Sequence, residues 1–495
     1  MGKVVIKEIN RFFGGISDDV REPASHKFAA SKHFDIFSNP YRLVPYRTTE
    51  EAETKSFDIV SFLVAENTLY GLGVDTGSIP KIYELNSIES PSPSWSASTN
   101  GAASSGSRAP AFFMEYKDYL YGLLSSGTHL WRWGDLTGSP TFSQTYKTLG
   151  ETISSTCQGV IGPDDKLYIP YNNHLSCLDS AGTLSDQILS VPSKYKISSI
   201  TEWKDFIAIG IRPKAARGKS FVYLYDPVTT NLEDVIDFGN GELEVLGNMN
   251  NHLIVGMNLT TDAFDDRILI KTYSGSLVET QKEVPMKDES GNVHRIFQGN
   301  NGLNKFEDGN KLYFLVDGIG IAGDFVGVWA VGQKNVSYPL AIVHDQRIGQ
   351  NESITDVNGF YKAGDYFFIA HSNDGSVDRT NDASVHLASS VYETQIFDEG
   401  EKGVDKKLLW VEVGYDPIPS GASVGLDYRV NHNSSYEDIF DESTQNAIST
   451  KATNETADNN DEFKRYKQIQ FRLISTGGSE ITTFRYAYEI LESKN

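Results

Sequence analysis

The sequence predicts an all-β fold: a β-propeller of about seven blades, preceded by an extended N-terminal arm and followed by a C-terminal β-sandwich. Three observations lead to this prediction. The 495 residues include 25 Tyr and 26 Phe in short apolar runs, which favours strands over long helices. A degenerate unit of polar turn, buried strand, loop and second strand recurs along most of the chain. The C-terminal part instead alternates apolar and polar residues, as half-buried strands do.

The recurring unit occupies residues 57–402, which we assign to the propeller. Its copies number about seven and follow one another roughly every 45–50 residues, a spacing typical of propeller blades. The turn-and-strand part of each copy lies at 65–72, 115–123, 162–169, 203–210, 249–257, 307–316 and 361–370.

Each copy begins with a polar pair such as Lys-Asp, Asn-Asn or Gly-Asp, which suits a tight hairpin turn because Asn, Asp and Gly tolerate positive φ. The β-branched and aromatic residues that follow suit a sheet buried on both faces. A single four-stranded blade cannot bury both faces alone, whereas blades stacked around an axis can. The alternative is two β-sandwiches in series, and the repeated order of elements favours the propeller over it.

The segments on either side of the repeats differ from them. Residues 1–56 have dense turn residues and poor periodicity, which predicts an extended arm with a few strands. Residues 403–495 contain four apolar or alternating segments, which predict a β-sandwich. Three polar stretches, at 87–108, 398–406 and 444–462, are expected to be an exposed loop, a hinge and a mobile loop.

Composition excludes several classes of protein. The formal net charge of −22 opposes specific nucleic-acid binding, although a channel wall that DNA slides past is compatible with it. Two Cys without a nearby His pair argue against a zinc site. There is no apolar run of membrane-spanning length, no secretory leader and no myristoylation signal, so we expect synthesis in a cytoplasm and no membrane span.

No catalytic, cofactor-binding or metal-binding residues are predicted. Nucleophile-elbow, phosphate-loop and metalloprotease motifs are missing, and the ten His are scattered and expected at surfaces or turns. Segments 125–131 and 372–375 match only fragments of the repeated boxes of sialidase propellers. The oxygen-rich loop 373–382 lacks the ligand order of a calcium-binding EF-hand and is expected to be solvated. Trp131, Trp133 and Trp329 are expected in the core rather than on a sugar platform.

The N-terminal stretch resembles tail proteins of tailed bacteriophages. The resemblance rests on Gly14-Gly15-Ile16-Ser17, on Asn39, and on the basic-Pro element from Arg42 through Pro45 to Arg47. It covers about a tenth of the chain and looks like the opening of the nozzle proteins of short-tailed phages, which are usually longer than this chain. A tail-tip, baseplate or adaptor propeller is equally compatible. The resemblance implies an assembly role for Gly14, Gly15, Ile16, Arg42, Pro45 and Arg47.

Three functions follow as hypotheses. The first is a non-enzymatic structural component of the phage tail that forms a homo-oligomeric ring with other virion tail proteins as partners. The second is a propeller that binds a host-surface glycan or receptor through loops such as 87–108 and 373–382. The third, the least favoured, is a propeller glycoside hydrolase, which requires an axial pocket holding two carboxylates.

Overall fold

The structure is a computed structural model of the whole chain. It describes residues 3–12, 28–37, 39, 41–54, 58–74, 80–90, 94–102, 110–124, 126–138, 140–215, 218–260, 266–286, 293–296, 305–318, 326–333, 340–347, 357–371, 376–380, 386, 389–400, 403–431, 433, 435–453 and 463–491. The chain forms two compact units. Unit 1 contains residues 1–48, 329–347 and 381–495, and unit 2 contains residues 49–328 and 348–380.

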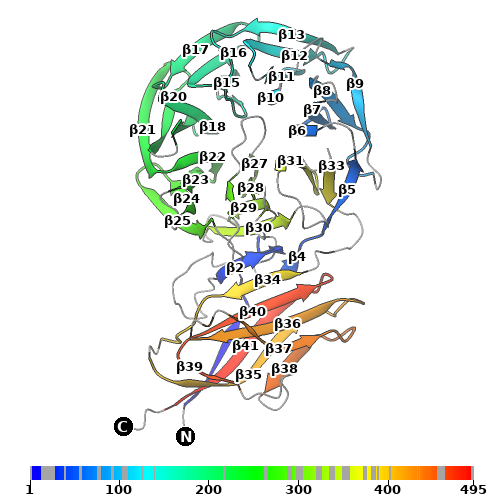
Figure 1. Cartoon of the computed structure of the whole chain (residues 1–495), viewed down its shortest axis with the longest axis vertical. Coiled ribbons are helices and arrows are strands. Elements are labelled where there is room, and N and C mark those ends of the chain that lie inside the picture. Colours follow the sequence, from blue (N-terminus) through cyan, green and yellow to red (C-terminus); the bar gives the residue numbers. More distant parts are fainter. Residues whose placement is uncertain are drawn as a thin grey trace. The chain divides into compact units, whose positions relative to one another are not determined.

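Unit 2 is a β-propeller, whose blades stand radially around an axis (Figure 1). In the described part of the chain, each of the first three blades has four antiparallel strands in chain order, with the first strand nearest the axis. The strands of these blades are β6 (Asp58–Ala65), β7 (Thr68–Val74), β8 (Pro80–Leu85) and β9 (Trp95–Ala102); β10 (Pro110–Tyr116), β11 (Tyr119–Leu124), β12 (His129–Gly134) and β13 (Thr141–Thr148); and β14 (Val160–Ile161), β15 (Leu167–Tyr171), β16 (His174–Leu178) and β17 (Leu184–Ser190).

Blades four and five repeat this order. Their strands are β18 (Tyr195–Trp203), β19 (Phe206–Pro213), β20 (Lys219–Asp226) and β21 (Asn231–Asn240), then β22 (Glu242–Met249), β23 (His252–Leu259), β24 (Arg267–Tyr273) and β25 (Val278–Pro285). The strands of blade six that lie wholly in unit 2 are β26 (Arg295–Ile296), β27 (Lys305–Asp308) and β28 (Lys311–Asp317), and the division between the units falls inside β29 (Gly327–Gly332). The described residues therefore include strands of all seven predicted blades.

The seventh blade closes the ring with a strand from the other end of the chain. Its strands β31 (Val357–Ala363), β32 (Tyr366–His371) and β33 (Ser376–Thr380) are followed at the rim by β5 (Thr49–Thr54), which pairs antiparallel with β33. The inner strand β31 also packs against β6 of the first blade. A ring closed in this way leaves no exposed sheet edge between its first and last blades.

The predicted hairpin turns are confirmed where inner strands meet second strands. Both central residues have positive φ at Glu66-Asn67 (46° and 61°), Lys117-Asp118 (50° and 64°) and Asn250-Asn251 (50° and 62°). This is the geometry of type I′ turns, whose twist matches that of the flanking strands. The local sequence thus fixes the register of these blades.

Adjacent blades share apolar cores. Trp131 and Trp133 of blade two are 0% and 1% exposed and pack with Leu72 of blade one, so the prediction that they are core residues is confirmed. The two cysteines are free and buried beside blade-four residues such as Ile209. Burial raises the pKa of the Cys157 thiol to about 12, which leaves it unreactive at neutral pH.

Unit 1 is a β-sandwich. One sheet has the order β1 (Val4–Ile9), β41 (Ile481–Ile490), β35 (Lys406–Tyr415) and β38 (Ser449–Thr453), with β39 (Arg465–Tyr466) also on β35. The second has the order β30 (Ala341–Arg347), β2 (Phe28–Lys32), β34 (Ser390–Thr394), β40 (Ile469–Thr476), β36 (Ser423–Val430) and β37 (Glu437–Glu442), and a small pair joins β3 (Phe34–Asp35) to β4 (Val44–Pro45). Phe471 of the second sheet lies 4.8 Å from Phe484 and 4.9 Å from Tyr486 of the first, between ring centroids.

The N-terminal residues contain the few strands that were predicted, and these strands pair with distant parts of the chain. β1 pairs along its whole length with β41, from Val4 opposite Glu489 to Ile9 opposite Phe484. β2 pairs with β34, while β5 belongs to the propeller. The predicted boundaries at residues 56 and 402 therefore do not coincide with the compact units. The reason is that each of these strands completes a sheet whose other strands lie hundreds of residues away, which a local pattern cannot reveal.

Two of the predicted polar loops contain strands. The stretch 87–108 includes β9, which pairs with β8, and the stretch 444–462 includes β38, which pairs with β35. The predicted hinge at 398–406 is also buried in part, since Asp398, Glu399 and Lys406 are 6%, 5% and 0% exposed. Edge strands bury little of their surface, so they carry no apolar signal. In the described residues, no helix is long and apolar enough to span a membrane.

The two N-terminal strand functions can be separated by truncation. Removing residues 1–10 deletes β1 alone, whereas removing residues 1–54 also deletes the closing strand β5. We expect faster hydrogen–deuterium exchange in β31–β33 only for the longer truncation, because only that variant leaves β33 as an open edge. Equal protection of β33 in both variants would contradict the closing role of β5.

Candidate axial site

The propeller contains a cavity of about 600 Å³ in the middle of its ring of inner strands. All seven blades contribute to its wall. The lining residues are Leu63, Met114, Gln158, Gly159, Val160, Ile200, Thr201, Glu202, Lys204, Asn248, Asn251, Lys305, Phe306, Glu307 and Tyr361.

The cavity lies toward the ends of the inner strands that lead into the hairpin turns. Glu202 is next to the last residue of β18 and Lys204 follows in its turn. In blade five, Asn248 is next to the last residue of β22 and Asn251 is the second residue of the turn. Trp203 Nε1 donates to the Asn251 carbonyl over 2.8 Å and so holds these two turns together. The same repeated hairpin therefore brings polar residues from successive blades to one end of the axis.

A buried lysine connects three blades at the cavity. Lys305 of β27 is 6% exposed, and its Nζ donates to the carbonyls of Ile200 (2.7 Å) and Leu246 (2.6 Å) and to Glu307 Oε1 (3.2 Å). The three donors of this ammonium are thereby used. Because a buried charge is tolerated only when paired and hydrogen-bonded, these bonds fix the relative positions of blades four, five and six.

Glu307 is fixed from two directions. Its Oε1 accepts from Lys305 and also from the Thr201 hydroxyl over 2.9 Å, so it joins β27 to β18 a second time. This atom is acting as a structural hydrogen-bond acceptor. Glu202, the second carboxylate in the lining, is exposed.

The lining also contains unused polar and apolar groups. The Oδ1 of Asn248 is buried and has no hydrogen-bond partner among the described residues. On blades six and seven, the rings of Phe306 and Tyr361 meet edge to face with centroids 4.8 Å apart. The unpaired Oδ1 is covered by protein, whereas Phe306 and Tyr361 form an aromatic corner of the lining.

Acidic residues gather near the inner-strand hairpin turns of blades one and two. Burial raises the pKa of Glu115, and the nearby charges of Glu66 and Asp118 raise it further. Burial also raises the pKa of the Tyr361 hydroxyl, with a smaller contribution from Glu115. Tyr361 is therefore a neutral hydroxyl at physiological pH.

A second buried charge cluster joins blades four and five. Arg212 forms an ion pair with Glu244, which is 3% exposed, and lies 3.5 Å from Glu242. Burial raises the pKa of Glu244 to about 8, against the opposing effect of Arg212 and Lys196. Burial and the charge of Arg212 also lower the pKa of Lys196. Desolvation is the dominant cost in this cluster.

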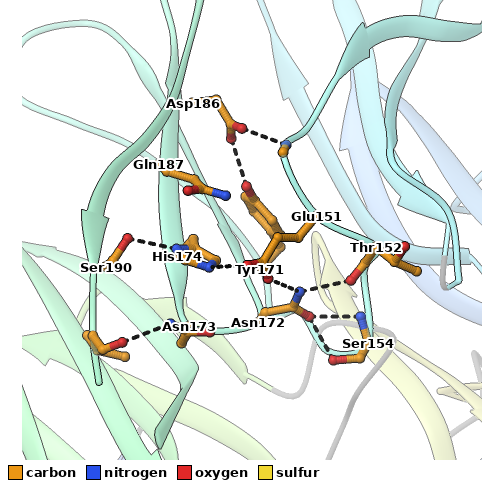
Figure 2. Close-up of polar contacts among 12 residues, drawn as sticks. Glu151, Thr152, Ser154, Tyr171, Asn172, Asn173, His174, Asp186, Gln187 and Ser190 are labelled. Carbon is orange, nitrogen blue, oxygen red and sulfur yellow. Dashed lines mark hydrogen bonds and ion pairs between the residues drawn. The ribbon is translucent and has the colours of Figure 1, made fainter. Parts of the chain in front are cut away.

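A polar network in blade three fastens a connecting segment to a hairpin turn (Figure 2). Asn172 occupies the turn with φ of 52°, and its Oδ1 accepts from the backbone N and the hydroxyl of Ser154, both at 2.8 Å. Its Nδ2 donates to the Thr152 carbonyl over 2.9 Å. Asp186 accepts from Gly150 N (2.6 Å) and from the Tyr171 hydroxyl (2.8 Å).

The same network places a serine, a histidine and a carboxylate in a row. His174 Nδ1 lies 2.7 Å from Ser190 Oγ, and its Nε2 lies 3.3 Å from Glu151 Oε1 (Figure 2). The second contact is an ion-pair distance without hydrogen-bond alignment, since Nε2 has no hydrogen-bond partner among the described residues. These residues line neither the axial cavity nor the small cavity of unit 1. We interpret the row as a cross-strand contact, because a catalytic triad also needs a substrate cavity and an oxyanion site.

The residues assigned to assembly lie in unit 1 or outside the described residues. Gly14, Gly15 and Ile16 lie outside the described residues. Arg42 forms ion pairs with Asp416 and with Glu480, the latter at 3.0 Å.

The remaining assembly residues pair within the sandwich. Pro45 pairs with Phe34, and Arg47 is bridged to His386. The described members of the set thus hold the N-terminal segment in unit 1, and their role in assembly stays a prediction.

Other sequence predictions can be compared with the site. Among the residues that the structure describes, His33, His174, His294 and His371 are buried, although the histidines were expected at surfaces or turns. In the described residues, no group of three or more His, Cys, Asp or Glu could hold a metal ion. The axial residues were not predicted. The one available signal was a polar interruption of an apolar inner strand, such as Thr201-Glu202 before Trp203.

Comparisons with known proteins concern the fold. No family model matches the chain, and no curated protein matches it. The chain is similar to the solved β-propeller domain of Cps50 (Swd1) from Myceliophteria thermophila, with 9% identity, a TM-score of 0.41, and coverage of 67% of this chain and 99% of that one. It is also similar to the extracellular domain of a putative hybrid two-component system from B. thetaiotaomicron, with 13% identity, a TM-score of 0.41, and coverage of 80% and 47%.

Substitution of the buried lysine tests its structural role. Lys305→Met keeps the aliphatic stem but leaves the Ile200 and Leu246 carbonyls without the ammonium, so we expect the free energy of unfolding to fall by about 1–3 kcal/mol. Denaturant unfolding measures this change. Lys214→Met, at an exposed position of the same propeller, is the control and is expected to change stability little. Equal effects of the two substitutions would contradict the assigned role.

The raised pKa of Glu244 predicts a pH dependence of stability. The folded state binds the proton of this carboxyl more tightly than the unfolded chain does, so its contribution is complete below about pH 4.5 and is lost as pH rises toward about 8. Glu244→Gln mimics the protonated form. We expect its unfolding free energy to match the wild type near pH 5 and to decline less, by about 1 kcal/mol or more, toward pH 8.

Urea unfolding at several pH values measures both curves. Glu233→Gln, at an exposed site on β21, serves as the control and should follow the wild-type curve. Parallel curves for wild type and Glu244→Gln would show that Glu244 does not titrate in this range.

Proposed function

We propose that this chain is a non-catalytic structural component of a tailed-phage virion, a tail protein that joins a symmetric ring of its own copies and contacts other tail proteins. The scaffold part of the proposal rests on two sets of contacts that hold the blades of the propeller together. β5 closes the ring at the rim, and Lys305 connects blades four, five and six at the axis. Such a body keeps its shape under load, which a particle component requires.

The tail assignment is supported by the sequence. The Gly14-Gly15-Ile16-Ser17 segment and the Arg42-to-Arg47 element resemble the openings of phage tail proteins. Arg42 and Pro45 hold the second of these segments in the sandwich of unit 1. The net charge of −22 suits a part that neighbours packaged DNA without gripping it.

The axial chemistry favours a scaffold over a glycoside hydrolase. The two carboxylates of the lining are Glu202 and Glu307, and Glu307 Oε1 is held by Lys305 and Thr201. A catalytic carboxylate must be free to face the substrate, whereas this oxygen already accepts hydrogen bonds from two side chains of the protein. The carboxylate of Glu307 is therefore better placed to connect the blades than to act as a catalytic acid.

Particles from cells that produce this protein provide the direct test. Mass spectrometry should find the chain at a fixed copy number, and cryo-electron microscopy should place it in a tail ring. A soluble monomer that is missing from every particle would overturn the proposal.

A single substitution tests the resemblance-based assembly segment. We expect Ile16→Asp to lower incorporation into particles at least tenfold, because a charge in a desolvated contact costs several kcal/mol. Incorporation is measured by quantitative mass spectrometry of purified particles. Ile448→Asp is the matched control, since Ile448 is 62% exposed in unit 1. The thermal unfolding midpoints of both variants should stay near that of the wild type, and normal incorporation of Ile16→Asp would reject an assembly role for this segment.

A further inference from the structure

The strand β1 lies at an edge of its sheet in the sandwich of unit 1. One side of β1 pairs with β41 in a continuous antiparallel register from Val4 to Ile9. Among the described residues, no strand pairs with the other side of β1. An edge of this kind presents backbone N–H and C=O groups with which a further strand can pair.

The residues that direct their backbone groups to this open side can be identified. Ile490 N donates to the Lys3 carbonyl over 3.1 Å, so Lys3 directs its backbone groups toward β41. Because this direction alternates along an antiparallel strand, every second residue counted from Lys3 also faces β41. The residues between them, which are Val4, Ile6 and Glu8, therefore direct their N–H and C=O groups to the open side.

The same three residues carry exposed side chains on one face of the sheet. Val4 and Ile6 are 57% and 62% exposed, although both are apolar. Glu8 completes the row, and its Oε2 lies 3.1 Å from Arg485 Nε of the neighbouring strand. Successive side chains point to opposite faces of a sheet, so Ile9, which is 3% exposed, lies on the core face. The open side of β1 is therefore bordered by an exposed apolar pair.

The opposite edge of the same sheet has a different character. β38 is the last strand in the order, and its exposed side chains include Ser449 and Lys451. Charged and polar side chains are a usual protection of an edge strand against pairing with another chain. β38 has this protection, whereas Val4 and Ile6 leave β1 open to such pairing.

The sequence of β1 is complementary to a copy of itself. In an antiparallel pair centred on Ile6, this residue lies opposite Ile6 of the second copy, and Val4 lies opposite Glu8. Each Ile6 then has Val4 of the other copy as its diagonal neighbour, so the four apolar side chains form one cluster. All three residues with outward-directed backbone groups find a partner in this register.

Charge selects this register over its neighbours. Lys7 lies opposite Val5 of the second copy, and no like charges face each other directly. Sliding one strand by two residues would place Lys7 opposite Lys3 or opposite its own copy, and like charges in such positions destabilise a sheet. Sliding by one residue would mismatch the outward-directed backbone groups.

We infer that β1 is a self-association edge, which pairs antiparallel with β1 of a second copy across a two-fold axis at Ile6 and joins the two sheets into one. Two-fold contacts are the commonest kind in homo-oligomers. One strand buries less surface than a standard interface, so the contact is weak, with a dissociation constant of about 10–100 μM. It does not rest on the proposed tail function, because a ring needs a separate head-to-tail contact.

Sedimentation velocity of the full-length protein tests this association. From about 1 to about 300 μM, the dimer should grow at the expense of the monomer. We expect Ile6→Lys, which places two like charges across the axis, to weaken dimerisation at least about tenfold. Ile448→Lys is the matched control, since Ile448 is also 62% exposed in unit 1, and it should dimerise like the wild type. A monomer at every concentration, or an association that Ile6→Lys leaves unchanged, would overturn the inference.

A proline variant separates the loss of pairing from the loss of folding. Ile6→Pro removes an N–H that points to the open side, where an edge strand tolerates proline. Its thermal unfolding midpoint should therefore stay near that of the wild type while dimerisation is lost. Lys7→Pro removes an N–H that faces β41, so it should lower the midpoint instead. A folded Ile6→Pro variant that dimerises like the wild type would show that β1 does not form the contact.

A cysteine variant locates the two-fold axis. Opposite residues of a hydrogen-bonded antiparallel pair have Cα atoms about 5.5 Å apart, a distance that a disulfide spans. Ile6→Cys should therefore form a cross-linked dimer on mild oxidation, measured by non-reducing electrophoresis. Cys157 and Cys177 are buried and should not interfere. Ile448→Cys is the control, and equal cross-linking of the two variants would reject the assigned axis.

Discussion

The pairing of β5 with β33 is the contact on which the propeller depends. Second strands such as β15 and β28 are buried on both faces, so a blade is stable only between two neighbours. A row of blades leaves two ends unsatisfied, and the contact between blades seven and one removes both. β5 comes from the N-terminal side of the propeller and pairs with β33 of blade seven. The ring is therefore closed by backbone hydrogen bonds, which do not depend on any single side chain.

Closure also explains the chemistry at the axis. Seven inner strands meet there, and no strand lies beyond them on the axial side. Their backbone N–H and C=O groups must therefore find hydrogen-bond partners other than a neighbouring strand. Lys305 donates to the carbonyls of Ile200 and Leu246, and the backbone N–H of Leu246 donates to the hydroxyl oxygen of Ser199 over 3.1 Å. Within the described lining, the buried Oδ1 of Asn248 is left without a hydrogen-bond partner.

The success of sequence-based prediction differed between inner and outer strands. Inner and second strands such as β22 and β23 are buried runs flanked by Asn250-Asn251, so both their positions and their turns were predicted. Outer strands such as β9 and β38 are polar and short of apolar residues, and they were taken for loops. An outer strand is held by backbone hydrogen bonds on one side only, and such bonds leave no mark on composition.

The axial residues illustrate a second limit. Thr201, Asn248 and Lys305 follow one another at intervals of some fifty residues, and each is an ordinary polar residue in its own segment. Only the radial arrangement of blades brings them to one cavity. Likewise, the buried histidines were expected at the surface because no local pattern tells which face of a strand is covered.

The sequence by itself determined the all-β class, the repeated blade, the hairpin turns and the C-terminal sandwich strands, because these follow from periodicity and turn chemistry within a few residues. The tertiary structure decided that β1 completes the sandwich, that β5 closes the ring, and that one cavity gathers residues from seven blades. Those features depend on pairing between distant segments, which is governed by which edges and faces stay unsatisfied after the local elements have formed.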